Sequence, residues 1–167
     1  MAGMMNRYCV ILGLVAAAIA ASAARADVVN GAAAKAGTYQ ARGATEIVDA
    51  GALAASLQGK PVVVRIHADW CPACKATQST IDDLKKAYTG KINFVQFDVT
   101  NAKTAAASQE EAQKLGLEKF YDAAKAATST VAVIDPKDGK VYATFYNDGA
   151  IGDYETAINT ALKAESR

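Results

Sequence analysis

The chain has 167 residues, of which 51% are apolar and 21% are charged, so it can bury one substantial core and does not belong to the disordered class. Its 18 Lys and Arg residues are balanced by 17 Asp and Glu residues, which gives a formal net charge of +1. Because a nucleic-acid-binding surface needs a clustered excess of cations, this balance argues against such a partner.

The first 26 residues have the pattern of a secretory signal peptide. Arg7 precedes an apolar run over residues 8–21, and the small residues of Ala24-Arg25-Ala26 form a cleavage site. An uncleaved membrane anchor is the alternative, but the run is shorter than the about 20 residues that span a bilayer. We therefore predict cleavage after Ala26, export to a compartment where disulfides persist, and loss of Cys9 with the peptide.

Residues 27–43 are rich in Ala and Gly without periodicity, and we predict a flexible N-terminal segment there. Beyond it, the patterns predict one domain over residues 44–167 in which strands and helices alternate. Its first half is expected to contain a strand at 45–48, a helix at 50–57, a strand at 62–67, a helix at 72–88 and a strand at 92–99. Gly59 and Pro61 end the first of these helices, and Gly90 ends the second.

The second half of the domain is expected to contain two adjacent helices at 103–115 and 117–126, strands at 130–134 and 140–146, and a last helix capped by Asp153. Gly116 is expected to end the first of these helices, and the segment DPKDG at 135–139 is typical of a hairpin turn. The resulting order, βαβαβααββα, predicts an α/β fold.

Cys71 and Cys74 are the only cysteines outside the first nine residues, and they directly follow a Val-rich strand. Pro72 suits the first turn of a helix, which places Cys71 at a helix N-terminus where a thiolate is stabilised. A structural disulfide at this spacing would constrain little of the unfolded chain, and a closed zinc site needs about four ligands where the exported chain offers two Cys and His67. The context therefore favours a redox pair, with Cys71 as nucleophile and Cys74 as resolving thiol, over a metal site or an inert disulfide.

The segment ADWCPACK, which follows VVVRIH, resembles the active-site segment of the thioredoxin-like family and of its periplasmic members in particular. The order of elements from Thr45 to Leu162 matches that family as well. The resemblance implies a thioredoxin-like fold, with a central mixed β-sheet flanked by helices. It also implies that Cys71 and Cys74 are the catalytic pair and that Trp70 packs beside them, with simple core packing as the alternative role of Trp70.

Two charged positions of the family pattern are replaced in this chain. Arg65 stands where family members usually carry an acid beneath the second cysteine, and Phe94 stands where many carry the Lys that pairs with that acid. If Arg65 faces the cysteines, its charge favours thiolate, lowers the thiol pKa and makes the disulfide more oxidising. The alternative is that a carboxylate neutralises Arg65. His67 shares its strand face and is either a packed, hydrogen-bonded side chain or an acid–base or metal-binding group.

A third departure lies in the segment ATSTVAVID. The family has a cis-proline just before this strand, facing the cysteines, and Ser129 takes that position here. A cis bond without proline costs about 3 kcal/mol, so we expect a trans bond between Thr128 and Ser129. In the family this loop hydrogen-bonds an extended substrate, and the proline is thought to keep metals from the thiols. Ser129 and the following Thr130 are therefore candidate substrate contacts.

An additional segment, LEKFYDAAKAAT, separates Gly116 from Ser129, where the family usually has only a few residues. The resemblance places this segment beside the active site. Phe120 and Tyr121 within it either line a partner surface or close a small satellite core.

Together these patterns predict an exported, periplasmic thiol–disulfide oxidoreductase that needs no cofactor, and they leave its redox direction open. Its expected partners are cysteine-containing exported proteins and a membrane redox protein that recharges the pair, with no nucleic acid. The alternative is a periplasmic module that binds a soft metal such as Cu(I) through Cys71 and Cys74, helped by His67. After cleavage the chain has no methionine to support such a site.

Overall fold

The computed structural model describes residues 39–40 and 49–167. The predicted signal peptide and the predicted strand at 45–48 lie outside these residues, so both stay predictions. Of the helices in the described part of the chain, none is long and apolar enough to cross a membrane.

Five strands form one mixed sheet in the order β1-β5-β4-β2-β3. Their bounds are β1 Tyr39–Gln40, β2 Val62–His67, β3 Asn93–Asp98, β4 Thr130–Ile134 and β5 Val141–Tyr146. β2 pairs in parallel with β3 and antiparallel with β4, β4 pairs antiparallel with β5, and β5 pairs in parallel with β1. The central mixed sheet is thus confirmed, while β1 falls in the segment 27–43, for which the sequence predicts no strand.

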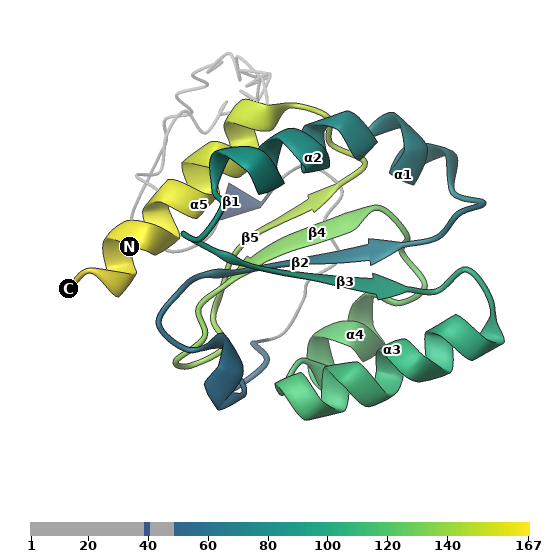
Figure 1. Cartoon of the computed structure of the whole chain (residues 1–167), viewed down its shortest axis with the longest axis horizontal. Helices are drawn as coiled ribbons and strands as arrows, with labels where there is room; N and C mark the ends of the chain where they lie inside the picture. The colour runs from purple at the N-terminus through teal and green to yellow at the C-terminus, as the bar shows by residue number, and fades with distance from the viewer. Residues whose placement is uncertain (1–38, 41–48) are drawn as a thin grey trace, which may run out of the picture. The chain divides into compact units, whose positions relative to one another are not determined.

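Helices cover both faces of this sheet (Figure 1). One face carries α1 Pro72–Ala76, α2 Gln78–Ala87 and α5 Ile151–Glu165. The other face carries α3 Ala102–Leu115 and α4 Glu118–Ala124. Sheet and helices together give the three-layer α/β architecture that the sequence predicts.

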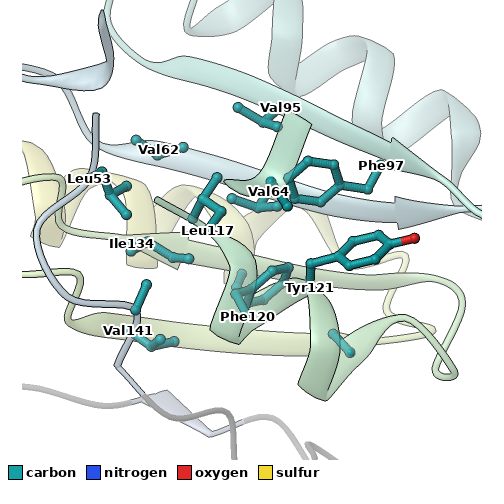
Figure 2. Packing of buried hydrophobic residues seen from close by; sticks show 14 of the residues in the cluster. Leu53, Val62, Val64, Val95, Phe97, Leu117, Phe120, Tyr121, Ile134 and Val141 are labelled. Carbon is teal, nitrogen blue, oxygen red and sulfur yellow. The ribbon is translucent and has the colours of Figure 1, made fainter. Parts of the chain in front are cut away.

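The alternation of side chains along β2 divides the apolar residues between two cores. Val62, Val64 and Ile66 are fully buried on the side of α3 and α4, where Figure 2 shows the first two among the side chains of that core. Val63 is buried on the opposite side, in a cluster with residues of α2 and α5. Arg65 shares the face of Val63, so it points toward α1, which contains Cys74, and toward α2, which follows it.

The prediction of a helix at 50–57 is wrong for most of the segment, because only Ala55–Leu57 is helical and forms a short 3₁₀ helix. Gly51 has φ +86°, which interrupts a right-handed helix. Three backbone N–H groups of the segment instead donate to carbonyls of the 135–139 turn and of the end of α3: those of Ala50, Leu53 and Ala54. These long-range hydrogen bonds replace the local ones that a helix would supply.

The helix predicted at 72–88 is divided into α1 and α2 at Thr77. The hydroxyl of Thr77 donates to the carbonyl of Ala73 at 3.0 Å, a contact that bends helices. The carbonyl of Cys74, which lies one turn before α2, accepts a hydrogen bond from the side chain of Arg65 at 2.8 Å. The break therefore lies directly behind the cysteine pair.

Two predictions about helix ends have opposite outcomes. Gly116 ends α3 in the left-handed conformation, as the sequence predicts. Asp153 does not cap α5, because that helix begins at Ile151 and Asp153 lies in its first turn. Asp148 holds the entry to the helix instead, since its side chain accepts from the N–H of Ala150 at 2.8 Å.

The additional segment after Gly116 folds as α4 and contributes to the core. Phe120 and Tyr121 are buried among the residues of Figure 2, and Tyr121 meets Phe97 edge to face with ring centroids 5.2 Å apart. The hydroxyl of Tyr121 donates to the carbonyl of Ala105 in α3. Both aromatic residues therefore belong to the core on the α3–α4 side, which extends the satellite core expected from the sequence and leaves no partner surface at these two side chains.

Candidate active site

The cysteine pair lies where β2 ends and α1 begins. Cys71 is the residue that caps the N-terminus of α1, and its sulfur accepts a hydrogen bond from the backbone N–H of Cys74 at 3.1 Å. Both cysteines are free thiols in this structure. Cys71 keeps 3% of its surface exposed and Cys74 keeps none, so Cys71 is the one of the two that reaches the protein surface.

The surroundings of Cys71 favour its thiolate. Burial opposes ionisation, but hydrogen bonds from the Cys74 thiol, the Thr128 side chain and the backbone N–H groups of Cys74 and Ala73 more than offset it. The pKa of Cys71 therefore lies below the ordinary value of a thiol. Because the thiolate is the reactive form of a cysteine, these hydrogen bonds make Cys71 the more readily ionised thiol of the pair.

The surroundings of Cys74 keep it protonated. Burial raises its pKa, and its hydrogen bond to Cys71 and the charge on Cys71 raise it further. The backbone at Ala68 and the positive charge of Arg65 act in the opposite direction without reversing the shift. Cys71, which is slightly exposed and has a lowered pKa, thus differs from Cys74, which is fully buried and has a raised pKa. This difference suits an exchange in which one thiol attacks first and the other completes the reaction.

Trp70 is exposed over 59% of its surface, so the alternative prediction that it packs in the core is wrong. Its indole N–H donates to the carbonyl of Thr100 at 2.9 Å, and the hydroxyl of Thr100 accepts from the N–H of Asp69 at 3.0 Å. These contacts tie the segment before Cys71 to the loop that follows β3. The ring of Trp70, the residue before Cys71 in the chain, thus lies open to solvent.

Arg65 is fully buried and faces the cysteine pair. Its Nη2 donates to the carbonyl of Cys74 and its Nη1 to the side-chain carbonyl of Gln78, both at 2.8 Å. Neither partner is a carboxylate. Phe94, the other replaced position, lies opposite Val63 in the β2–β3 register and has the Lys85 ammonium 4.3 Å from its ring centroid, so it does not pair with Arg65.

His67 is half-buried at the end of β2. Its Nε2 lies 3.2 Å from a carboxylate oxygen of Asp69, whose side chain is 77% exposed. Its buried Nδ1 has no hydrogen-bond partner among the described residues. One ring nitrogen is therefore hydrogen-bonded and the other is enclosed, which fits the packed role better than an acid–base role at Cys71.

Ser129 replaces the proline with a hydrogen-bonding residue. It has φ +71°, and its N–H, which a proline lacks, donates to the carbonyl of Ile66 at 2.9 Å. Its carbonyl accepts from the N–H of Asn147, and its hydroxyl lies 3.5 Å from that of Thr77. Thr130 is buried and donates to the carbonyl of Ala127, so both candidate substrate contacts are occupied within the protein.

The sequence patterns did not predict two residues of the site: Thr128, which hydrogen-bonds Cys71, and Gln78, which binds Arg65. The only feature of the sequence that could have indicated Thr128 is its position one residue before Ser129. No feature of the sequence indicates Gln78, which lies in a region predicted as one uniform helix. Across residues 39–40 and 49–167, no group of three or more His, Cys, Asp or Glu side chains is gathered that can hold a metal ion.

A mixed sheet with a Cys-x-x-Cys pair at the start of the helix after its second strand defines a thioredoxin-fold protein with a dithiol site. The family model for thioredoxin matches residues 46–134, which is more than half of the 167 residues. The chain therefore belongs to the thioredoxin family.

Several known relatives share shorter stretches with this chain. It is 42% identical over 45 residues to a thiol:disulfide interchange protein TxlA homolog of Synechocystis, covering 27% of this chain and 25% of that protein. It is 35% identical over 60 residues to the chloroplastic thioredoxin-like protein HCF164 of Arabidopsis thaliana, covering 36% of this chain and 22% of that protein. With thioredoxin C-2 of Corynebacterium nephridii it shares 39% identity over 46 residues, covering 28% of this chain and 43% of that protein. The matches thus span less than half of each relative.

Among solved structures, the chain is similar to a thiol:disulfide interchange protein of the thioredoxin family from Chlorobium tepidum. The TM-score is 0.48 at 22% identity, over 65% of this chain and 83% of that one. The thioredoxin of Fasciola hepatica gives a TM-score of 0.42 at 22% identity, over 63% of this chain and 85% of that one.

Proposed function

We propose that the protein is a thiol–disulfide oxidoreductase that acts on cysteine-containing protein substrates. The observation that carries this proposal is the asymmetry of the pair, in which Cys71 is slightly exposed with a lowered pKa and Cys74 is fully buried with a raised pKa. The exposed Trp70 beside Cys71 gives a protein partner an apolar contact at the point of attack. The TxlA homolog of Synechocystis, which is a thiol:disulfide interchange protein, supports the same activity.

The exchange proceeds in two displacements. The Cys71 thiolate attacks one sulfur of a substrate disulfide, a mixed disulfide forms, and the other substrate sulfur leaves as a thiolate. Cys74 then loses its proton and attacks the Cys71 sulfur, which closes the Cys71–Cys74 bond and releases the second substrate thiolate. Two electrons pass from the protein dithiol to the substrate, and the reverse sequence oxidises a substrate dithiol.

The setting of this activity follows from the sequence of the first 26 residues. We place the mature protein in the periplasm, where exported proteins with cysteines are its substrates and a membrane redox protein recharges the pair.

Equilibration with glutathione tests the proposed exchange. In buffers of defined GSH and GSSG, Cys71 and Cys74 are expected to convert together between dithiol and disulfide, following a two-electron dependence on [GSH]²/[GSSG]. The measurement is acid quenching, alkylation and mass spectrometry of the tryptic peptide that holds both residues. A pair that stays reduced across all buffers and binds one Cu(I) ion would reject the enzyme and favour the metal-binding module.

The predicted export has its own test. Expression of the full chain in a Gram-negative host is expected to yield a soluble periplasmic protein that begins at Asp27, because Ala24 and Ala26 place small residues at the two positions that the peptidase reads. Intact-mass and N-terminal analysis of the osmotic-shock fraction measures this. Recovery of the complete chain from the membrane fraction would contradict the periplasmic assignment.

A further inference from the structure

Arg65 is the largest fully buried side chain in the described residues, and it carries a permanent charge. Removing a guanidinium from water is costly, so the surrounding groups must compensate for it. The family pattern places an acid at this point, which gives the site the opposite sign of charge. The question is what a buried cation does beneath a cysteine pair.

The direct partners of Arg65 are neutral. The carbonyl of Cys74 and the amide oxygen of Gln78 each accept from one terminal nitrogen at 2.8 Å, and the buried Nε has no partner among the described residues. None of the ion pairs found in that part of the chain includes Arg65. The nearest carboxylate in this network is Asp82, which accepts from the other end of the Gln78 amide at 3.0 Å. A neutral amide thus separates the cation from the anion, and the positive charge remains available to the thiol above it.

We propose that Arg65 is a positioning residue that stabilises Cys74 as a thiolate when the Cys71–Cys74 bond breaks, and thereby biases the pair toward oxidising its substrates. This inference rests on the proposed exchange activity. A substrate thiolate attacks the Cys71 sulfur, the Cys71–Cys74 bond breaks, and Cys74 keeps the electron pair. A second substrate thiolate then attacks the mixed disulfide, a substrate disulfide forms, and Cys71 leaves as a thiolate. The protein dithiol has gained two electrons and the substrate has lost them.

The electrostatics of the site agree with this role. Burial is the main cause that raises the pKa of Cys74, and the charge of Arg65 lowers it. A cation acts strongly in a site that excludes water, because the effective dielectric constant there is low. A leaving thiol with a lower pKa leaves faster, and a stabilised thiolate favours the reduced pair at equilibrium. A carboxylate at residue 65 would act in the opposite direction on the same sulfur.

A purely mechanical role is the competing explanation. By donating to the carbonyl of Cys74, Arg65 also joins α1 to β2, and its loss would loosen the active-site turn whatever its charge. Loosening and loss of charge both lower stability. Only loss of charge raises the pKa of Cys74 and moves the redox equilibrium in a fixed direction, so those two quantities separate the explanations.

Three variants test the charge, all in the full chain with Cys9→Ser, in which Cys71 and Cys74 are the only thiols. Arg65→Met removes the charge, and Arg65→Lys keeps it. Gln78→Glu combined with Asp82→Asn leaves Arg65 in place and puts a carboxylate within hydrogen-bonding distance of it, without a change of side-chain size. The last variant keeps the test informative if Arg65→Met fails to fold.

The first measurement is the equilibrium constant of each protein with glutathione. We expect Arg65→Met and the double variant to hold their disulfide about tenfold more strongly than the parent, which corresponds to ~30 mV toward reducing potentials. Arg65→Lys is expected to change this constant less than threefold. The second measurement is a thiolate absorbance titration of Cys74 in a Cys71→Ser background, where both neutralising changes are expected to raise its pKa.

The outcomes separate this inference from the proposed activity. If the parent fails to exchange with glutathione, the activity is wrong, and the titration of Cys74 still decides whether Arg65 stabilises its thiolate. If the parent exchanges and the folded variants keep its equilibrium constant and its Cys74 pKa, Arg65 is only a structural link. Equal shifts in Arg65→Lys and Arg65→Met would likewise reject a role of the charge.

Discussion

Cys74→Ser is expected to accumulate a covalent mixed disulfide with a peptide disulfide substrate, while its multiple-turnover rate falls to that of the buffer thiol. The nucleophile Cys71 remains, and the serine hydroxyl can donate the hydrogen bond that the Cys74 thiol makes in the parent. Attack therefore proceeds, but no second thiol is present to release the product. Non-reducing electrophoresis and intact mass measure the adduct.

Cys71→Ser is the matched control, because it removes one sulfur and leaves the other. Cys74 is fully buried and its pKa is raised, so this variant is expected to form almost no adduct under the same conditions. Equal trapping by both variants would show that the two thiols are interchangeable. The assignment of nucleophile and resolving thiol would then be wrong.

The pH dependence of trapping gives the same assignment a quantitative form. The pKa of Cys71 is lowered by the hydrogen bonds to its sulfur, so its thiolate persists to a lower pH than that of an ordinary thiol. The rate of adduct formation by Cys74→Ser is therefore expected to fall with its midpoint at a lower pH than the rate of a free cysteine peptide with the same substrate. Equal midpoints for the two thiols would indicate that Cys71 is an ordinary thiol.

The sequence predicts the parts of this fold whose structure is set locally. β2 and β4 are Val-rich runs and have the predicted bounds, and Gly116 ends α3 because few other residues adopt its φ of +75°. The cysteine pair is predictable for the same reason, since strand, Pro72 and helix are adjacent in the chain. Local patterns also place Arg65 on the correct face of β2.

The parts that the sequence does not predict depend on contacts between distant residues. The segment 50–57 has the composition of a helix, but the N–H groups of Ala50, Leu53 and Ala54 donate to the carbonyls of Gly139, Pro136 and Leu115. Thr128 reaches Cys71 only because β4 lies beside β2 in the sheet. The sequence also offered the alternative that a carboxylate neutralises Arg65, but the observed side-chain partner is the amide of Gln78. An uncharged amide cannot be identified from the pattern of charged residues.

The close approach of two turns provides the prediction with the largest effect on stability. Gly139 has φ +72° at the end of the β4–β5 turn, and its carbonyl accepts from the N–H of Ala50 at 3.0 Å. A Cβ at residue 139 would lie 2.7 Å from the carbonyl carbon of Gly51 and nearer still to other backbone atoms of that residue. Backbone cannot rotate away as a side chain can, so one of the two turns must move.

Gly139→Ala is therefore expected to lower the free energy of unfolding by about 2–4 kcal/mol, the sum of an unfavourable positive φ and of steric overlap. Gly90→Ala is the matched control, because Gly90 has φ +75° and nothing within 4 Å of the added Cβ. It carries only the cost of the backbone conformation, about 1–2 kcal/mol. Urea denaturation of the three proteins, with the slope m compared among them, measures both values. Equal losses in the two variants would show that the 49–51 segment yields to the added methyl group and does not hold the β4–β5 turn in place.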